Sequence, residues 1–133
     1  MKNVIAVVIG LVAGGMVNMG LVMLGPMVVP PPPGADMTTA EGLAAAMPLL
    51  KPAHFVFPFL AHALGTLVGA LVAFRLAASR AQALAYAVGA FFLVGGIAAA
   101  NMIPAPTWFV ALDLVAAYLP MAWLGTTLAR RPG

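Results

Sequence analysis

Four long apolar runs fill most of this chain, at about 4–25, 53–74, 81–103 and 108–128. Each run has about 20 residues or more, and a helix of that length rises about 30 Å, the thickness of the hydrocarbon core of a bilayer. None of the runs alternates polar and apolar residues as the strands of a membrane barrel do. The sequence therefore predicts an all-α fold, a bundle of four transmembrane helices.

The composition agrees with lipid as the outer solvent. Of the 133 residues, 64% are hydrophobic and only 7% are charged, whereas a soluble domain has about a quarter charged residues. We expect residues 1–133 to form a single integral membrane domain. Lys2 before the first run is also a feature of signal peptides, but this run is too long for a signal sequence, so we interpret it as a retained helix.

The charges predict the topology. One side of the threaded bundle receives the cations Lys2, Arg75, Arg80, Arg130 and Arg131. The long loop 26–52 on the other side carries Lys51 with Asp36 and Glu41. Because positive residues prefer the cytoplasmic side, we expect both termini to be cytoplasmic and the loop to lie outside. The cations form no basic patch, which argues against a nucleic-acid partner.

The outer loop is rich in proline. The run Pro30–Pro33 favours a stiff polyproline II segment. After it, Thr38 or Thr39 is a typical N-cap for a short helix to about residue 47, with Glu41 in the first turn. We interpret this loop as a rigid lid that packs on the bundle, with a ligand-binding role as the alternative.

Small residues predict close helix contacts. Gly10 and Gly14 are four residues apart on the first helix, and Gly65 and Gly69 repeat the spacing on the second. Such pairs let backbones approach closely where lipid gives no hydrophobic driving force. We interpret both pairs as packing faces within one chain, and a homodimer face is the alternative.

A few polar residues lie inside the apolar runs, where they are energetically expensive. Asp113 is the most costly, His62 is second, and Asn18 and Asn101 complete the set. At 1.5 Å per residue, all four fall in the outer half of the membrane, one from each helix. We therefore predict a shared internal cluster. Secondary candidates are His54 and Thr66 on the His62 face, and Glu41 in the loop.

Two interpretations of the cluster stay open. It is either a buried hydrogen-bond network that specifies one packing, or a protonatable or cation-binding site that faces the outside, since a histidine changes charge near neutral pH. We expect no metal and no cofactor, because the chain has no cysteine and no HExxH spacing. Methionines favour Cu(I), and the first helix carries a stripe of them, Met16, Met19, Met23 and Met27. This stripe faces away from the polar cluster, so the two do not form one copper site.

Several segments resemble a known group of proteins. They are residues 30–34, 47–48, 51–69, 104–109, 112–114 and 118–125, so the likeness covers nearly the full chain. Together they are similar to an uncharacterised group of small four-helix bacterial inner-membrane proteins. The resemblance implies a bacterial origin and a four-helix architecture, and it implies no activity.

The sequence contains no nucleophile with a plausible base and no phosphate-binding loop, so we expect no enzymatic activity. Our first hypothesis is an accessory or structural membrane subunit, or a homo-oligomeric bundle. The alternative is a proton- or cation-linked small-solute transporter that uses the Asp/His/Asn cluster. The expected partners are the lipid bilayer and either further copies or a larger membrane complex, and the expected location is the bacterial inner membrane.

Overall fold

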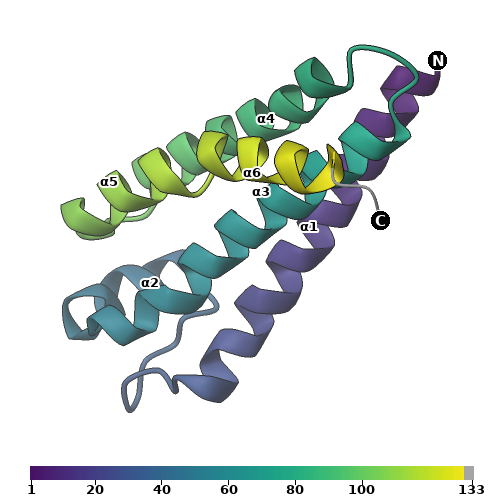
Figure 1. Ribbon diagram of the computed structural model, residues 1–133. Helices are drawn as coiled ribbons and strands as arrows, with labels where there is room; N and C mark the ends of the chain where they lie inside the picture. The colour runs from purple at the N-terminus through teal and green to yellow at the C-terminus, as the bar shows by residue number, and fades with distance from the viewer. Residues whose placement is uncertain (131–133) are drawn as a thin grey trace.

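The structure is a computed structural model that describes residues 1–130. It is all-helical over this range (Figure 1). The helices are α1 (Lys2–Val28), α2 (Ala40–Ala46), α3 (Val56–Leu76), α4 (Ala81–Met102), α5 (Thr107–Ala116) and α6 (Leu119–Arg130), with 3₁₀ turns at Met47–Leu49 and Pro52–Phe55. Four segments are long and apolar enough to cross a membrane: Lys2–Val28, Pro52–Leu76, Ala81–Met102 and Thr107–Arg130. The four predicted segments are thus helical and are candidate membrane spans, which imply contact with a bilayer.

The first helix is longer than the sequence predicted. α1 continues through Pro26 to Val28, whereas we expected it to end near residue 25. Pro26 lacks the backbone N–H that would bond four residues back, and α1 ends two residues after it. Gly25 is buried, and a Cβ atom there would lie 2.9 Å from the Cβ atom of Phe57 on α3. The contact with Phe57 therefore holds the end of α1 against its neighbour.

α1 lies alongside α3 through glycines (Figure 1). A Cβ atom at Gly10 would lie 2.6 Å from the carbonyl oxygen of Gly69, and one at Gly14 would meet that of Gly65. In the opposite direction, a Cβ atom at Gly65 would lie 2.9 Å from the oxygen of Gly14. The four glycines of the two predicted pairs thus face each other within one chain and bring the two backbones together.

The fourth predicted helix is two helices. We expected one element over 108–128, but α5 ends at Ala116 and α6 begins at Leu119. Pro120 supplies the physical reason, because its nitrogen has no hydrogen and its ring excludes the carbonyl of the residue four positions earlier. At the end of α5 the backbone amide of Ala117 donates to the backbone carbonyl of Asp113. At the start of α6 the amide of Ala122 donates to the carbonyl of Tyr118. The break reorients the chain between Asp113 and Tyr118.

The two ends of the bundle differ in composition. At one end α1 meets the α3–α4 turn, where the Asn3 side chain accepts from the amides of Ala78 and Ser79. At this same end Arg75 donates to the carbonyl oxygen of Ala129. We call this the basic end, because it also carries Lys2, Arg80 and Arg130. Arg131, the remaining cation predicted here, lies outside the described residues.

The other end is covered by the loop. Figure 1 shows α2 at the end of the bundle away from the N-terminus and from the end of α6. The Thr39 hydroxyl caps α2 by accepting from the Gly42 amide at 3.0 Å. Leu43 and Met47 pack against Phe55 and Phe109 of the bundle. We call residues 30–51 the lid, because this segment closes the end of the bundle opposite the basic end.

Candidate functional site

Asp113 and His62 form the polar centre of the bundle. His62 comes from the second turn of α3, and Asp113 from the middle of α5. The His62 Nδ1 atom lies 2.8 Å from Asp113 Oδ1. Asp113 is only 5% exposed, so its buried carboxylate depends on hydrogen bonds from within the protein. The structure therefore brings together the two residues that the sequence ranked first.

Tyr118 is the third member of the centre, and sequence reasoning missed it as a site residue. Its hydroxyl donates to Asp113 Oδ2 at 3.0 Å, and its ring stacks on that of His62 with centroids 5.8 Å apart. In a continuous helix, residues five apart differ by about 140° in direction, so Tyr118 would not face Asp113. The break between α5 and α6 removes this restriction. We call His62, Asp113 and Tyr118 the triad.

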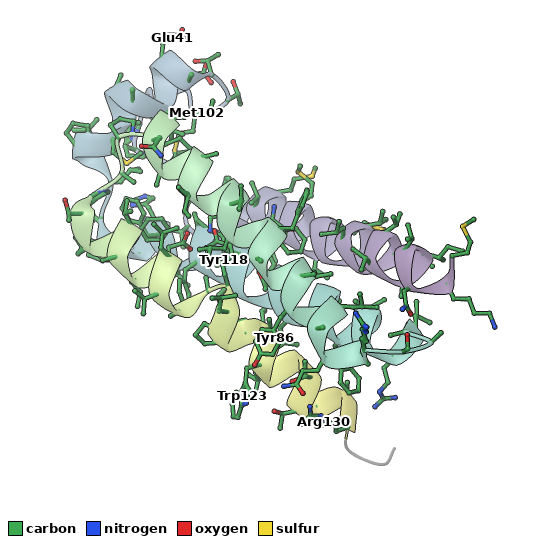
Figure 2. All side chains as sticks on the ribbon, turned by 90° about the horizontal axis from the view of Figure 1, so that it is seen from above. Glu41, Tyr86, Met102, Tyr118, Trp123 and Arg130 are labelled. Carbon is green, nitrogen blue, oxygen red and sulfur yellow. The ribbon has the colours of Figure 1, made fainter. Side chains whose placement is uncertain are left out.

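Gly96 on α4 makes room for the triad. A Cβ atom at this position would lie 2.6 Å from Tyr118 Cζ and would also overlap its hydroxyl. The tyrosine ring therefore occupies space that any other residue at position 96 would fill. Figure 2 shows Tyr118 near the middle of the bundle, between Glu41 at the lid end and Arg130 at the basic end. A tyrosine in mid-run, two residues before a proline, is the sequence signal that could have identified it.

The hydrogen bonds define the roles of the atoms. Both Asp113 oxygens accept, one from His62 and one from Tyr118. A carboxylate has no donor, so the His62 Nδ1 atom carries the hydrogen, and Nε2 of the neutral ring keeps a lone pair. The ring hydrogen bond of His62 within residues 1–130 is the one at Nδ1, and the His62 side chain is 28% exposed. Nε2 is therefore available to a ligand or a proton.

A cavity of about 150 Å³ leads from the lid to the triad. We call it the outer pocket. Its lid wall is Met37, Leu43, Met47 and Leu50, and its bundle wall includes Phe55, Ala99, Ala100, Ile103, Phe109, Val110 and Leu114. The polar side chains in its lining are His54, His62 and Asp113. An apolar cavity with a few convergent polar groups is the usual form of a small-molecule site.

A second cavity of about 150 Å³ lies on the α1 side of the triad. We call it the Asn18 pocket, because the half-buried Asn18 side chain lines it together with His62, Thr66 and Tyr118. The Thr66 hydroxyl donates to the His62 carbonyl at 2.8 Å and is thereby satisfied within α3. His62 borders both cavities. Asn18 thus lies near the centre, across a cavity from His62.

The remaining candidates lie elsewhere. Asn101 is exposed and donates to the Ile97 carbonyl of its own helix, so the structure does not bring it to the triad. Glu41 lies exposed on α2 (Figure 2). His54 ties the lid to the bundle: its Nδ1 atom accepts from the Lys51 amide at 2.9 Å, and its Nε2 atom, 3.0 Å from the Pro30 oxygen, donates to it.

Within residues 1–130, no group of three His, Cys, Asp or Glu side chains is placed to hold a metal ion. His62 and Asp113 form a hydrogen-bonded pair, and Tyr118 supplies the second hydrogen bond to the carboxylate. The arrangement can do two things chemically. It can accept a proton at His62 Nε2, and it can accept a hydrogen bond from a ligand in a cavity that His62 lines.

Comparison with known proteins gives no family. No family model matches the chain, and no match was found among curated proteins or solved structures. The resemblance to a bacterial group therefore stays a prediction.

Proposed function

We propose that this protein is a proton-linked carrier of a small, mainly apolar solute, with the outer pocket as its binding site. The observation that carries the proposal is the triad at the base of an apolar cavity beneath the lid. A buried hydrogen-bond network that only specifies packing needs no adjoining cavity and no vacant histidine nitrogen. His62 has both, and a histidine is the side chain that most readily gains and loses a proton near neutral pH.

The proposed role consists of binding and proton exchange without covalent chemistry, so we propose no enzymatic activity. We place the protein in the bacterial inner membrane with both termini in the cytoplasm. The support is that Lys2, Arg75, Arg80 and Arg130 gather at the basic end, as the positive-inside rule expects of a cytoplasmic face. The lid and the outer pocket then face the outside.

Binding in lipid nanodiscs tests this function. Benzyl alcohol and benzylamine are suitable probes, because a cavity of about 150 Å³ holds a benzene ring. We expect at least one probe to bind saturably to the wild type and to lose that binding in Ala100→Phe, which fills the outer pocket. Calorimetry in two buffers of different ionisation enthalpy should show protons moving when the probe binds. Absence of saturable binding by both probes would refute the proposal.

An accessory subunit or homo-oligomer is the second candidate function. One observation favours it: Met16, Met19, Met23 and Met27 are all exposed along α1. Thioether side chains adapt to irregular partner surfaces, although lipid would cover the same face equally well. Native mass spectrometry of gently extracted protein distinguishes the two. A reproducible complex with a different protein would support the accessory role, and a monomer that binds a probe would support the carrier.

A further inference from the structure

We infer that the outer pocket takes a small lipophilic ammonium ion, and that this ion and a proton on His62 exclude each other. The inference rests on the proposed function and names the class of its substrate. It follows from the charge of the triad, from the free nitrogen of His62 and from the size and walls of the pocket.

The charge of the pocket favours a cation. Asp113 supplies a carboxylate at its base, and within the part of the chain that the structure describes no lysine or arginine lines the outer pocket. An anionic solute would bring a second negative charge into an apolar site that has no fixed positive charge to pair with it. A cation would instead find a buried carboxylate held ready by His62 and Tyr118.

The contact between ligand and protein is His62 Nε2. Because Nδ1 donates to Asp113, the neutral ring presents its lone pair at Nε2 and can accept from an N–H group of the ammonium ion. The ring thus connects the ligand to the carboxylate. When a proton occupies Nε2 instead, the ring is a cation with two donors and no acceptor, so it repels the ammonium ion. The site holds one positive charge at a time.

Few ionisable side chains lie around His62 and could take part in the competition between ligand and proton. The ionisable side chains that face it are Asp113 from α5, Tyr118 from the break before α6, and His54 across the outer pocket. His54 already uses both ring nitrogens, in contacts with Lys51 and Pro30. On the α1 side the facing polar residue is the uncharged Asn18. His62 is therefore the group at which proton and ligand compete.

The size and walls of the pocket limit the ligand. About 150 Å³ is the volume of a cavity that holds one benzene ring. Phe55 and Phe109 line it with ring centroids 4.8 Å apart, and aromatic faces attract organic cations. The ligand class is therefore an amine with one ring or a short alkyl chain and at least one N–H group. Larger amines do not fit without movement of the lid.

The test compares benzylamine with benzyl alcohol in nanodiscs, since the two differ mainly in charge and in the donor group. We expect benzylamine to bind wild type at least about tenfold more tightly, the scale of one hydrogen bond to a charged partner. Asp113→Asn should remove most of that preference, and the ratio of the two affinities, not either affinity alone, is the measured quantity. The control Asn101→Ala changes a polar residue that lies away from the pocket and should alter neither affinity.

A pH series on the wild type needs no variant. Benzylamine affinity should fall as the pH is lowered and protons compete with the ligand for His62 Nε2, whereas benzyl alcohol affinity should stay constant. If benzyl alcohol binds as tightly as benzylamine, the ammonium inference is wrong while the proposed site stands. If benzylamine affinity does not change with pH, the proton linkage of the carrier is wrong as well, and only the outer pocket as a binding site stands. If neither probe binds saturably, both proposals fall.

Discussion

The half of the bundle beneath the lid, which we call the outer half, and the half toward the basic end, which we call the inner half, pack their helices differently. Near the basic end and the centre, the helices touch through backbone: Gly10 faces Gly69, and a Cβ atom at Gly125 would lie 2.6 Å from the Leu67 oxygen on α3. Near the lid, large side chains such as Phe55 and Phe109 hold the elements apart around a cavity. The polar centre lies where the close contacts give way to the cavity.

This difference shows what each half is built to do. Backbone contact leaves no room for a side chain, a water molecule or a solute, so the inner half seals the bundle. In the outer half, His62 lines a cavity that lies beneath the lid. Both halves are hydrophobic in composition, so hydropathy alone does not separate them. Substitutions that add or remove a few atoms should affect the two halves in different ways.

The largest effect is expected from Gly14→Leu in the α1–α3 contact. Its Cβ atom would collide with the Gly65 carbonyl oxygen and with the Phe92 ring. Overpacking of this kind destabilises by about 3 kcal/mol, which thermal unfolding in nanodiscs should detect. The matched control is Gly15→Leu, where no atom lies within 4 Å of an added Cβ. Equal stability of both variants would mean that α1 does not pack on α3 through this face.

Gly96→Ala tests the space that the triad occupies. The new Cβ atom would overlap the Tyr118 ring and push it away from Asp113. We expect a loss of about 2 kcal/mol in stability, typical of added volume at a packed site, together with weaker benzylamine binding. Gly95→Ala is the control, because an added Cβ there meets nothing within 4 Å. Similar behaviour of the two alanine variants would contradict the position of Tyr118.

Tyr118→Phe removes one hydrogen bond and keeps the ring. Loss of the donor to Asp113 Oδ2 should cost about 1.5 kcal/mol of stability, because the acceptor is a buried charged group. Denaturant titration of the reconstituted protein measures the change. Tyr86→Phe serves as the control, since Tyr86 is only half-buried and lies in the inner half. A loss no larger than that of Tyr86→Phe would show that the Tyr118 hydroxyl does not stabilise the centre.

The smallest effect is expected from His54→Ala, which weakens the attachment of the lid to the bundle. It removes the contacts with the Pro30 oxygen and the Lys51 amide, together worth about 1 kcal/mol or slightly more at an accessible position. Hydrogen exchange of residues 34–51 should become faster while exchange in α3 stays unchanged. Asn101→Ala, which breaks an exposed contact within α4, should leave the lid as it is. Unchanged exchange in His54→Ala would mean that other contacts hold the lid.

The common level of His62 and Asp113 along the bundle was predictable from the sequence, whereas the direction in which a side chain points was not. The rise per residue is nearly constant, so counting placed His62 and Asp113 at one level, and they lie in contact. Direction around a helix depends on where the helix ends and on how it is broken. Asn101, near the end of α4, lies at the outer end of its helix but points to the surface.

Tyr118 shows the same limitation most clearly. The spacing of Asp113 and Tyr118 in the sequence does not predict their contact. The contact depends on the break between α5 and α6, and on the absence of a side chain at Gly96. The hydrogen bond at Nε2 of His54 depends in a similar way on Pro30, which is distant in the sequence. Periodicity describes single helices, and these features arise only when several elements meet.

The most direct test is nitrogen-15 NMR of the two histidines, the only ones in the chain. The structure assigns them opposite neutral tautomers: His62 carries its hydrogen on Nδ1, facing Asp113, and His54 carries it on Nε2, facing Pro30. With the His54→Ala variant for assignment, we predict one signal set of each tautomer, and added benzylamine should shift only the Nε2 resonance of His62. If both histidines are Nε2–H tautomers and neither responds to benzylamine, His62 does not present a free acceptor to the outer pocket, and the account is wrong.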